Sequence, residues 1–538
     1  MRTCSAYLLI TFFSLFLFIP GLANLPVVDR DEAHFSQATR QMVQSGQYFQ
    51  IRFQEQTRFQ KPPGINWLQA ASIHLFSHGD ATLIWPYRLP SLMGGLLSVL
   101  AIFFFARRFV NDQIALTTAL FLASTLLMQV ESHMAVIDSA LLLTVIVMQG
   151  SLWVIYYNAK NQVATCVSWA ILFWLAMAIG LLLKGVTPLV GALSILTLCW
   201  IEGNAQWLKK LYSFFGLSSL LVFSLVWLTF VNHAEHSNYL IQMIQKDLLP
   251  KLQGSHESHG KPPFFHLTIL PLTFWPVSLF LWQGLSYAWD HRNETMVRFL
   301  LAWIVPTWIF FEVMPTKLPQ YILPTFPPLA LLCALAVFHG QHRILSKKLL
   351  SLLQCSWLIL TGALAVVLLL LPLLLLQKLT IIGIIVSISM ILIASFSCYY
   401  AWRAKYEYAI IAVLSVALVC YPLIFSRLLP QLEPLWISRN TAQLINHNLV
   451  SDESPLLVVG YGEPSLVMYL NTKRVRYLSL QEAEAALLAK PKSLLLIDQE
   501  NFDHIIAKKN YQILADLKGY NYSKGRWIHL YLISFSNV

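Results

Sequence analysis

The feature that most constrains this chain is the recurrence of apolar segments about 20 residues long, the length that spans a bilayer. The chain has 538 residues, of which 57% are hydrophobic and only 12% are charged. Soluble proteins carry about 25% charged residues, so we expect a polytopic α-helical membrane protein. About thirteen transmembrane helices are predicted, over 5–23, 86–106, 112–130, 139–157, 165–183, 186–201, 211–231, 266–287, 297–313, 321–338, 350–376, 379–401 and 407–426.

The loops between these segments differ in charge, which predicts the orientation of the chain. Cytoplasmic loops of membrane proteins carry an excess of Lys and Arg. With a cytoplasmic N-terminus this bias accounts for the net charge of +11, so we expect no nucleic-acid partner. Loops 24–85 and 232–265 and the C-terminal tail then face outwards. Twelve cations fall in the cytoplasmic connections (Arg107, Arg108, Lys160, Lys209, Lys210, Arg292, Arg298, Arg343, Lys347, Lys348, Arg403 and Lys405), and the short outer connections receive only Lys184, Lys317 and Lys378.

The N-terminal segment allows a second interpretation. Residues 21–24 resemble a signal-peptide cleavage site. We prefer a transmembrane helix over 5–23, because the apolar run is long for a signal peptide. Either interpretation leaves the outer loops in the same place.

Two regions outside the predicted membrane segments have their own patterns. In the first outer loop, residues 33–49 and 65–76 each place apolar side chains on one helical face, which fits short interfacial helices. After residue 430, strands alternate with helices, which predicts a small outer α/β domain over 431–538 following a transmembrane domain over 1–430. The predicted strands cover 455–460, 475–478, 493–497 and 527–535, and the predicted helices cover 463–470, 481–490 and 500–509.

Three carboxylates stand at the outer ends of apolar segments. Asp31 and Glu32 follow the first segment, and Asp138 begins the fourth. A carboxylate just outside the membrane, with charged neighbours that tune its pKa, is a candidate general base. The alternatives are a solvated acidic loop for the first pair and a simple topological turn for Asp138.

Outer cations run against the charge bias, and each therefore needs a local partner. One answer is that their side chains extend to lipid headgroups, and the other is that they bind a phosphorylated lipid. Several cations on one face favour the phosphate. The candidates are Arg58, Lys61, Arg88, Lys184 and Lys317, the last in a proline-rich turn with Tyr321.

The second outer loop contains a candidate metal site. His256, Glu257 and His259 fall within four residues, and imidazole and carboxylate groups ligate divalent metals. They lack the helical HExxH spacing, which argues against a metalloprotease. A polar loop without a metal is the alternative.

Five motifs occur in a familiar order along the chain. Together they resemble the bacterial membrane glycosyltransferases of the lipid A aminoarabinose-transferase type, which belong to the GT-C superfamily and are related to the protein O-mannosyltransferases. The resemblance runs from about residue 5 to residue 430 and is loose over the tail. The motifs are Asp31-Glu32, Gln60-Lys61-Pro62-Pro63-Gly64-Ile65-Asn66-Trp67, Ala135-Val136-Ile137-Asp138, His259-Gly260-Lys261-Pro262-Pro263-Phe264-Phe265 and Thr316-Lys317-Leu318-Pro319-Gln320-Tyr321-Ile322-Leu323-Pro324.

The resemblance implies transfer of a sugar from a polyprenyl-phosphate donor to an acceptor at the periplasmic face of the bacterial inner membrane, with lipid A or another envelope glycan as acceptor. It implies that Asp31 is the catalytic acid/base and Asp138 a second essential aspartate. Lys61, Tyr321 and Lys184 would lie near the carrier phosphate, and His259 would contact a metal. The family's Glu-Lys-Pro motif has Gln60 in place of its metal-binding Glu, which weakens the metal prediction.

Other functions remain open at this point. A transporter or flippase of lipid-linked sugars would place ionisable residues in mid-membrane and show repeats with broken helices, whereas here the charges lie at segment ends and no repeat is evident. A protein O-glycosyltransferase differs only in its acceptor. A non-catalytic scaffold would leave the outer cations unexplained.

Overall fold

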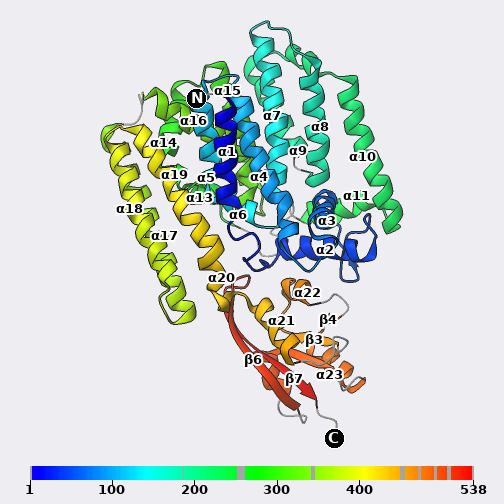
Figure 1. Cartoon of the computed structure of the whole chain (residues 1–538). Coiled ribbons are helices and arrows are strands. Elements are labelled where there is room, and N and C mark those ends of the chain that lie inside the picture. Colours follow the sequence, from blue (N-terminus) through cyan, green and yellow to red (C-terminus); the bar gives the residue numbers. More distant parts are fainter. Residues whose placement is uncertain are drawn as a thin grey trace.

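The computed structural model describes residues 3–185, 187–250, 261–340, 346–448, 455–470, 474–489, 493–505 and 511–535. These residues form three layers (Figure 1). A helical bundle contains the apolar segments, a thin layer of short helices lies beneath one end of it, and the C-terminal domain lies beneath that layer. The cavity described below lies where the three layers meet.

The apolar segments all fold as helices, because an unbroken apolar run satisfies its backbone groups internally in lipid. Eight described helices are long and apolar enough to cross a membrane, or up to ten if each of two bent pairs is one span. Three of the thirteen predicted spans are shorter apolar helices, α1, α8 and α9, so the polytopic fold is confirmed with fewer full-length spans. The helices are α1 Thr3–Phe18, α4 Trp85–Ala106, α5 Asp112–Ser124, α6 Leu126–His133, α7 Asp138–Lys160, α8 Val167–Leu183, α9 Thr187–Glu202, α10 Phe214–Glu235, α13 Phe265–Thr273, α14 Leu281–Asp290, α15 Thr295–Val313, α16 Phe326–His339, α17 Lys347–Leu376, α18 Ile381–Trp402 and α19 Tyr406–Leu423, with the 3-10 turns η1 Gln206–Leu211, η3 Val277–Phe280 and η4 Pro319–Thr325.

Two of the predicted spans, 112–130 and 266–287, are bent helix pairs. The chain turns by 60° between α5 and α6 and by 112° between α13 and the helix over 277–290. Thr125 is extended at the first break, and the amide of Leu126 donates to the carbonyl of Trp275 (2.7 Å). The second break contains Pro276, which cannot continue a helical hydrogen-bond ladder. The first bend directs the polar end of α6 towards the outer layer.

The outer layer is built from the two polar loops. The two predicted amphipathic helices are present as α2 Asp31–Ser45 and α3 Gly64–Ser77, and Phe35, Ala38 and Met42 on α2 are buried as their spacing predicts. The second loop packs against the first through Tyr239, whose hydroxyl donates to the carbonyls of Arg58 (2.8 Å) and Lys61 (2.7 Å). The remaining elements of the layer are β1 Arg52–Phe53, β2 Gln56–Thr57, α11 Tyr239–Met243 and the π-turn η2 Ile244–Leu248.

The C-terminal domain is a five-stranded mixed sheet with order β4-β3-β5-β7-β6, in which β3, β4 and β5 are parallel and β7 and β6 are antiparallel. Buried side chains on both faces of β3 and β5 pack against α21 and α22 on one face and α23 and α24 on the other. The α/β prediction is confirmed, but β6 and α21 were not predicted. Helix α19 continues through η5 Ile424–Leu428 and α20 Leu429–Gln431 as one apolar span, Tyr406–Gln431. The elements after it are η6 Glu433–Leu435, α21 Ile437–Asn448, β3 Leu456–Val459, α22 Ser465–Tyr469, β4 Val475–Tyr477, α23 Leu480–Ala489, β5 Leu494–Asp498, α24 Gln499–Ile505, β6 Tyr511–Asn521 and β7 Arg526–Phe535.

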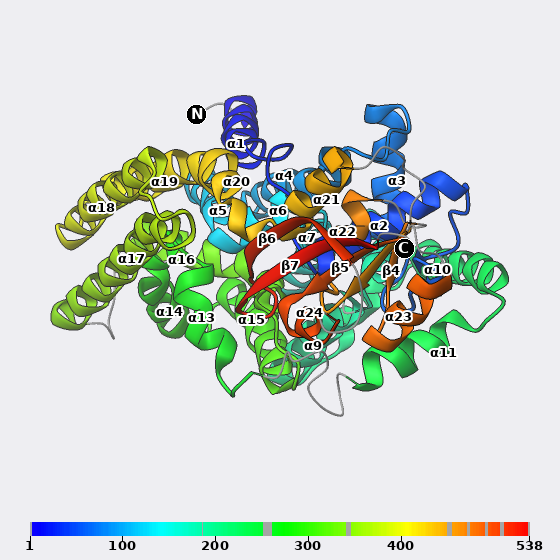
Figure 2. The same ribbon diagram turned by 90° about the horizontal axis from the view of Figure 1, so that it is seen from below.

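The C-terminal domain contacts the outer layer at several points. Arg40 on α2 donates to the carbonyls of Met468 (2.6 Å) and Leu470 (3.1 Å), and the amide of Val27 donates to the hydroxyl of Tyr469 (2.8 Å). Viewed from below, the sheet lies in front of α2 and the bundle (Figure 2). The domain therefore covers the first outer loop.

All seven cysteines are free. Cys333 and Cys420 are buried in the bundle, and Cys4 at the start of α1, Cys166 directly before α8 and Cys355 within α17 are exposed. The C-terminal domain contains no cysteine in its sequence.

Candidate active site

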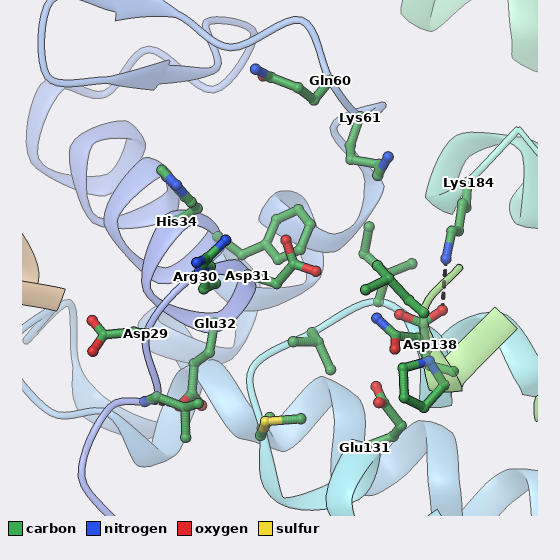
Figure 3. A pocket seen from close by; sticks show the side chains of 18 of the residues that line it. Asp29, Arg30, Asp31, Glu32, His34, Gln60, Lys61, Glu131, Asp138 and Lys184 are labelled. Carbon is green, nitrogen blue, oxygen red and sulfur yellow. Dashed lines mark hydrogen bonds and ion pairs between the residues drawn. The ribbon is translucent and has the colours of Figure 1, made fainter. Parts of the chain in front are cut away.

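A cavity of about 710 Å³ lies between the bundle, the outer layer and the C-terminal domain. Its walls come from loop 28–35, the segment 56–61, α6 and the start of α7, the 316–321 turn and the β6–β7 turn. Carboxylates and cations from these separate segments converge on one space (Figure 3). The predicted residues that line it are Asp31, Glu32, Arg58, Lys61, Asp138, Lys184 and Tyr321.

Asp31 is the first residue of α2, and its side chain is exposed to the cavity. The N-terminal end of a helix stabilises negative charge, because its amide dipoles point towards that end. His34 lies one helical turn later and also lines the cavity. Burial and the nearby Arg58 lower the pKa of His34 to about 3, so its imidazole is neutral at physiological pH. His34 was missed in the sequence, although its i, i+3 spacing from Asp31 places both on one face.

Glu32 and Arg88 form a fully buried ion pair, which differs from the roles predicted for them. The guanidinium donates to both carboxylate oxygens (2.8 and 2.9 Å), and both side chains have 0% exposure. The same carboxylate accepts from the amides of Val28 and Ala135 (2.7 Å each). Arg88 also donates to three backbone carbonyls, and it is not among the described residues that line the cavity. With their polar atoms already paired, the two residues join the first loop to α4 and α7 rather than meeting a phosphate.

Asp138, Lys184 and Tyr321 meet on one wall of the cavity. The Lys184 ammonium donates to Asp138 (2.7 Å) and lies 5.0 Å from the centre of the Tyr321 ring. Asp138 is the first residue of α7, Lys184 follows α8, and Tyr321 is in η4. Three segments that are distant in the sequence therefore hold one ion pair at the cavity wall.

Another part of the cavity wall carries Lys61 and Arg58. Lys61 forms an ion pair with Asp247 of the second outer loop (3.2 Å), and both side chains line the cavity and are about one-fifth exposed, 21% and 17%. The Arg58 guanidinium lies 5.0 Å from the centre of the Phe35 ring. Asp247 was not predicted, because nothing in the sequence links it to Lys61.

Other predicted residues lie elsewhere. Lys317 is buried outside the described cavity lining, and its ammonium donates to the carbonyl of Lys261 (3.3 Å). The proposed metal ligands His256, Glu257 and His259 lie outside the described residues. In the part of the chain that the structure describes, no group of three His, Cys, Asp or Glu side chains is arranged to bind a metal. Gln60 lines the cavity, where it presents a neutral amide in place of a carboxylate.

Glu131 is a further carboxylate that sequence reasoning did not select. It lies near the end of α6 with 4% exposure and lines the cavity below Asp138 (Figure 3). Its position follows from the bend between α5 and α6, which a straight span over 112–130 would not predict.

A second, apolar cavity of about 360 Å³ adjoins the first. Val28, Val130 and Met134 line both cavities. The residues that line the second cavity are all aliphatic, aromatic or methionine. The other lining residues come mainly from the bundle and include Leu126, Trp275, Leu364, Leu368, Met390, Tyr421, Phe425 and Trp436. A charged chamber therefore borders an apolar one at the edge of the bundle.

Comparisons with known proteins agree with this architecture. Residues 60–228 match the family model described as dolichyl-phosphate-mannose-protein mannosyltransferase. Undecaprenyl phosphate-alpha-4-amino-4-deoxy-L-arabinose arabinosyl transferase of Pseudomonas aeruginosa strain LESB58 is 29% identical over 337 residues, 62% of this chain and 59% of the relative. The corresponding enzyme 2 of Proteus mirabilis strain HI4320 is 28% identical over 339 residues, 61% and 58% of the two chains. The matched regions thus span less than two thirds of these relatives.

Solved structures extend the likeness over the whole chain. The crystal structure of ArnT from Cupriavidus metallidurans bound to undecaprenyl phosphate matches with a TM-score of 0.74 and 18% identity, covering 99% of this chain and 98% of that one. The apo Archaeoglobus fulgidus oligosaccharyltransferase matches with a TM-score of 0.53 and 12% identity, covering 92% and 69%. The predicted resemblance to membrane glycosyltransferases of the aminoarabinose-transferase type is therefore confirmed, and the chain has the fold of ArnT.

Proposed function

We propose that this protein transfers a sugar from a polyprenyl-phosphate donor to lipid A or another cell-envelope acceptor at the periplasmic face of the bacterial inner membrane. The observation that carries the proposal is the single cavity in which Asp31, Asp138, Lys61 and Lys184 meet beside an apolar cavity. The donor of the Pseudomonas relative is an undecaprenyl-phosphate aminoarabinose, and an aminoarabinose is the sugar we infer here.

The two adjoining cavities match the two parts of such a donor. An isoprenoid chain needs an apolar surface, and its phosphate needs cations. Lys61, Arg58 and Lys184 line the polar cavity, and the apolar cavity opens beside it. In this arrangement the first isoprenoid units occupy the apolar cavity, while the phosphate and sugar occupy the polar one.

The cavity also contains the groups that transfer requires. An oxygen of the acceptor attacks the anomeric carbon, the bond from that carbon to the phosphate oxygen breaks, and the configuration inverts because a single displacement occurs. Asp31 accepts the proton of the acceptor oxygen. The carrier phosphate leaves with an added negative charge, which Lys61 and Lys184 stabilise. The donor already carries the activation energy, so no nucleotide is involved.

Lys61 already has a carboxylate partner, which the phosphate of the donor would replace. Lys61 is paired with Asp247 across the two outer loops, so donor binding replaces a carboxylate by a phosphate at the same ammonium. Asp138 holds Lys184 in the same way elsewhere on the cavity wall. Both cations are therefore fixed in position before the donor arrives.

Replacing Asp31 with Asn in purified protein tests the proposal. Sugar transfer from a polyprenyl-phosphate donor to lipid A should collapse while undecaprenyl phosphate still binds, because Asn has the shape but not the basicity of Asp. Lys61→Ala is the matched counterpart and should weaken binding of the carrier. Unchanged turnover in Asp31→Asn removes this residue from the chemistry. Movement of a lipid-linked sugar across the membrane of vesicles, without its transfer to an acceptor, would instead support the flippase alternative.

A further inference from the structure

The turn between β6 and β7, residues 522–525, reaches from the C-terminal domain to the cavity. Tyr522 and Ser523 line it together with Asp31. The turn is fixed within its own domain, because Asn521 donates to the buried carboxylate of Glu463 (2.8 Å) and accepts from the amide of Lys524 (3.1 Å). A rigid turn from the far end of the chain therefore forms one wall of the proposed active site.

This turn binds the two residues that immediately precede Asp31. The amide of Asp29 donates to the hydroxyl of Tyr522 (2.8 Å), and the Arg30 guanidinium donates to the carbonyl of Ser523 (2.8 Å). One contact is to the backbone of residue 29 and the other to the side chain of residue 30, so together they fix the chain on both sides of one peptide. The direction in which α2 begins depends on that peptide.

Arg30 has an unusual backbone conformation. Its φ is 73° and its ψ is −116°, a combination that residues other than glycine seldom adopt. Such a conformation persists only where surrounding contacts hold it. Two of the contacts at this point come from the β6–β7 turn, beside the amide of His34, which donates to the carbonyl of Arg30 (3.0 Å).

We infer that the β6–β7 turn is a positioning element of the active site, and that it holds the strained residue 30 so that Asp31 faces the cavity. This inference rests on the proposed function. On this inference the C-terminal domain contributes to catalysis indirectly, because it positions Asp31 and does not act on the sugar itself. The turn should thus affect the rate of the transfer step more than the affinity for the donor.

Tyr522→Phe tests this inference, because it removes one hydroxyl and keeps the ring. We expect kcat to fall about fivefold to tenfold, as for the loss of one hydrogen bond, with little change in the Kd for undecaprenyl phosphate. Tyr520→Phe is the matched control, since Tyr520 packs against Trp527 away from the cavity lining, and it should leave both constants unchanged. Equal kcat values for the two variants, or a loss confined to donor affinity, would overturn the inference.

Arg30 provides a second test. Arg30→Ala and Arg30→Gly both remove the guanidinium, but glycine adopts the positive φ without strain. We expect kcat of Arg30→Gly to exceed that of Arg30→Ala several-fold. The reverse order would contradict a role for the strained conformation.

A measurement that does not depend on turnover separates this inference from the proposed function. Hydrogen exchange in a peptide covering residues 26–36 should be faster in Tyr522→Phe than in Tyr520→Phe, because the Asp29 amide loses its acceptor. If the wild-type protein transfers no sugar, the proposed function fails while this comparison still decides the role of the turn. Identical exchange in both variants would refute the turn's role even in an active enzyme.

Discussion

Replacing Glu32 with Gln distinguishes the buried role of this residue from the catalytic role that its place in the Asp-Glu motif predicts. Each carboxylate oxygen accepts two hydrogen bonds, one from Arg88 and one from a backbone amide. In Gln one oxygen becomes an NH₂ group that faces two donors. Two hydrogen bonds are then lost, and the guanidinium of Arg88 is left buried without a negative partner.

The magnitude follows from the burial of the pair. Both side chains have 0% exposure, and breaking a buried ion pair by removing one partner costs about 3–5 kcal/mol. A natural domain has only about 5–15 kcal/mol of net stability, so we expect a clear loss in the free energy of unfolding. Undecaprenyl phosphate should still bind to the folded fraction, because Arg88 does not line the described cavity.

Unfolding in mixed detergent micelles with increasing SDS measures this loss. Glu55→Gln is the matched control, since Glu55 lies exposed in the same loop and should unfold as the wild type does. A Glu32→Gln protein with wild-type stability but no transfer activity would refute the reasoning and return Glu32 to the catalytic residues.

Two further predictions follow from charged groups at the cavity and its rim. Asp247→Asn should tighten binding of undecaprenyl phosphate up to about fivefold, because it removes a partly exposed ion pair worth about 0.2–1 kcal/mol that competes for Lys61; unchanged or weaker binding in a titration would argue against phosphate at Lys61. Burial, with a smaller contribution from Glu463, raises the pKa of Asp29 from 3.8 to about 6. Between pH 4 and 6 the folded protein therefore keeps the Asp29 proton, whereas the unfolded chain has released it. The free energy of unfolding thus falls as pH rises through this range, by up to about 3 kcal/mol above pH 6. Asp29→Asn should thus be more stable than the wild type at pH 7.5 and similar to it near pH 4; a pH-independent difference in SDS unfolding would contradict this.

The general fold could be predicted because it depends on local properties of the sequence. The length and apolarity of a segment decide whether it is a membrane helix, and the alternation after residue 430 indicated the α/β domain. The break at Thr125 and the missed strand β6 depend on tertiary contacts, such as the bond from the Leu126 amide to Trp275. No window of sequence contains that information.

Some features of the candidate site could likewise be predicted from the sequence, and others could not. Asp31, Asp138, Lys61 and Lys184 were predicted because each is a charge at an outer segment end, and the structure brings all four to one cavity. The pairing of Glu32 with Arg88 joins residues 56 positions apart. The contact between residue 29 and the β6–β7 turn joins residues 493 positions apart. Such pairings set which charges are available to a ligand, and charge patterns alone do not reveal them.

The distribution of the cysteines has a practical consequence for the orientation of the protein. Cys4 lies at the start of α1 and Cys166 directly before α8, whereas the loop after α1 and Lys184 after α8 line the cavity, so these two exposed thiols are at the helix ends away from it, and the C-terminal domain carries no cysteine. A cysteine introduced at the exposed position Gln512 on β6 would be the sole thiol of that domain. A membrane-impermeant maleimide applied to intact spheroplasts should then label Gln512→Cys and leave the wild-type protein unlabelled. Such labelling would show directly in the cell that the C-terminal domain lies on the outer face of the membrane.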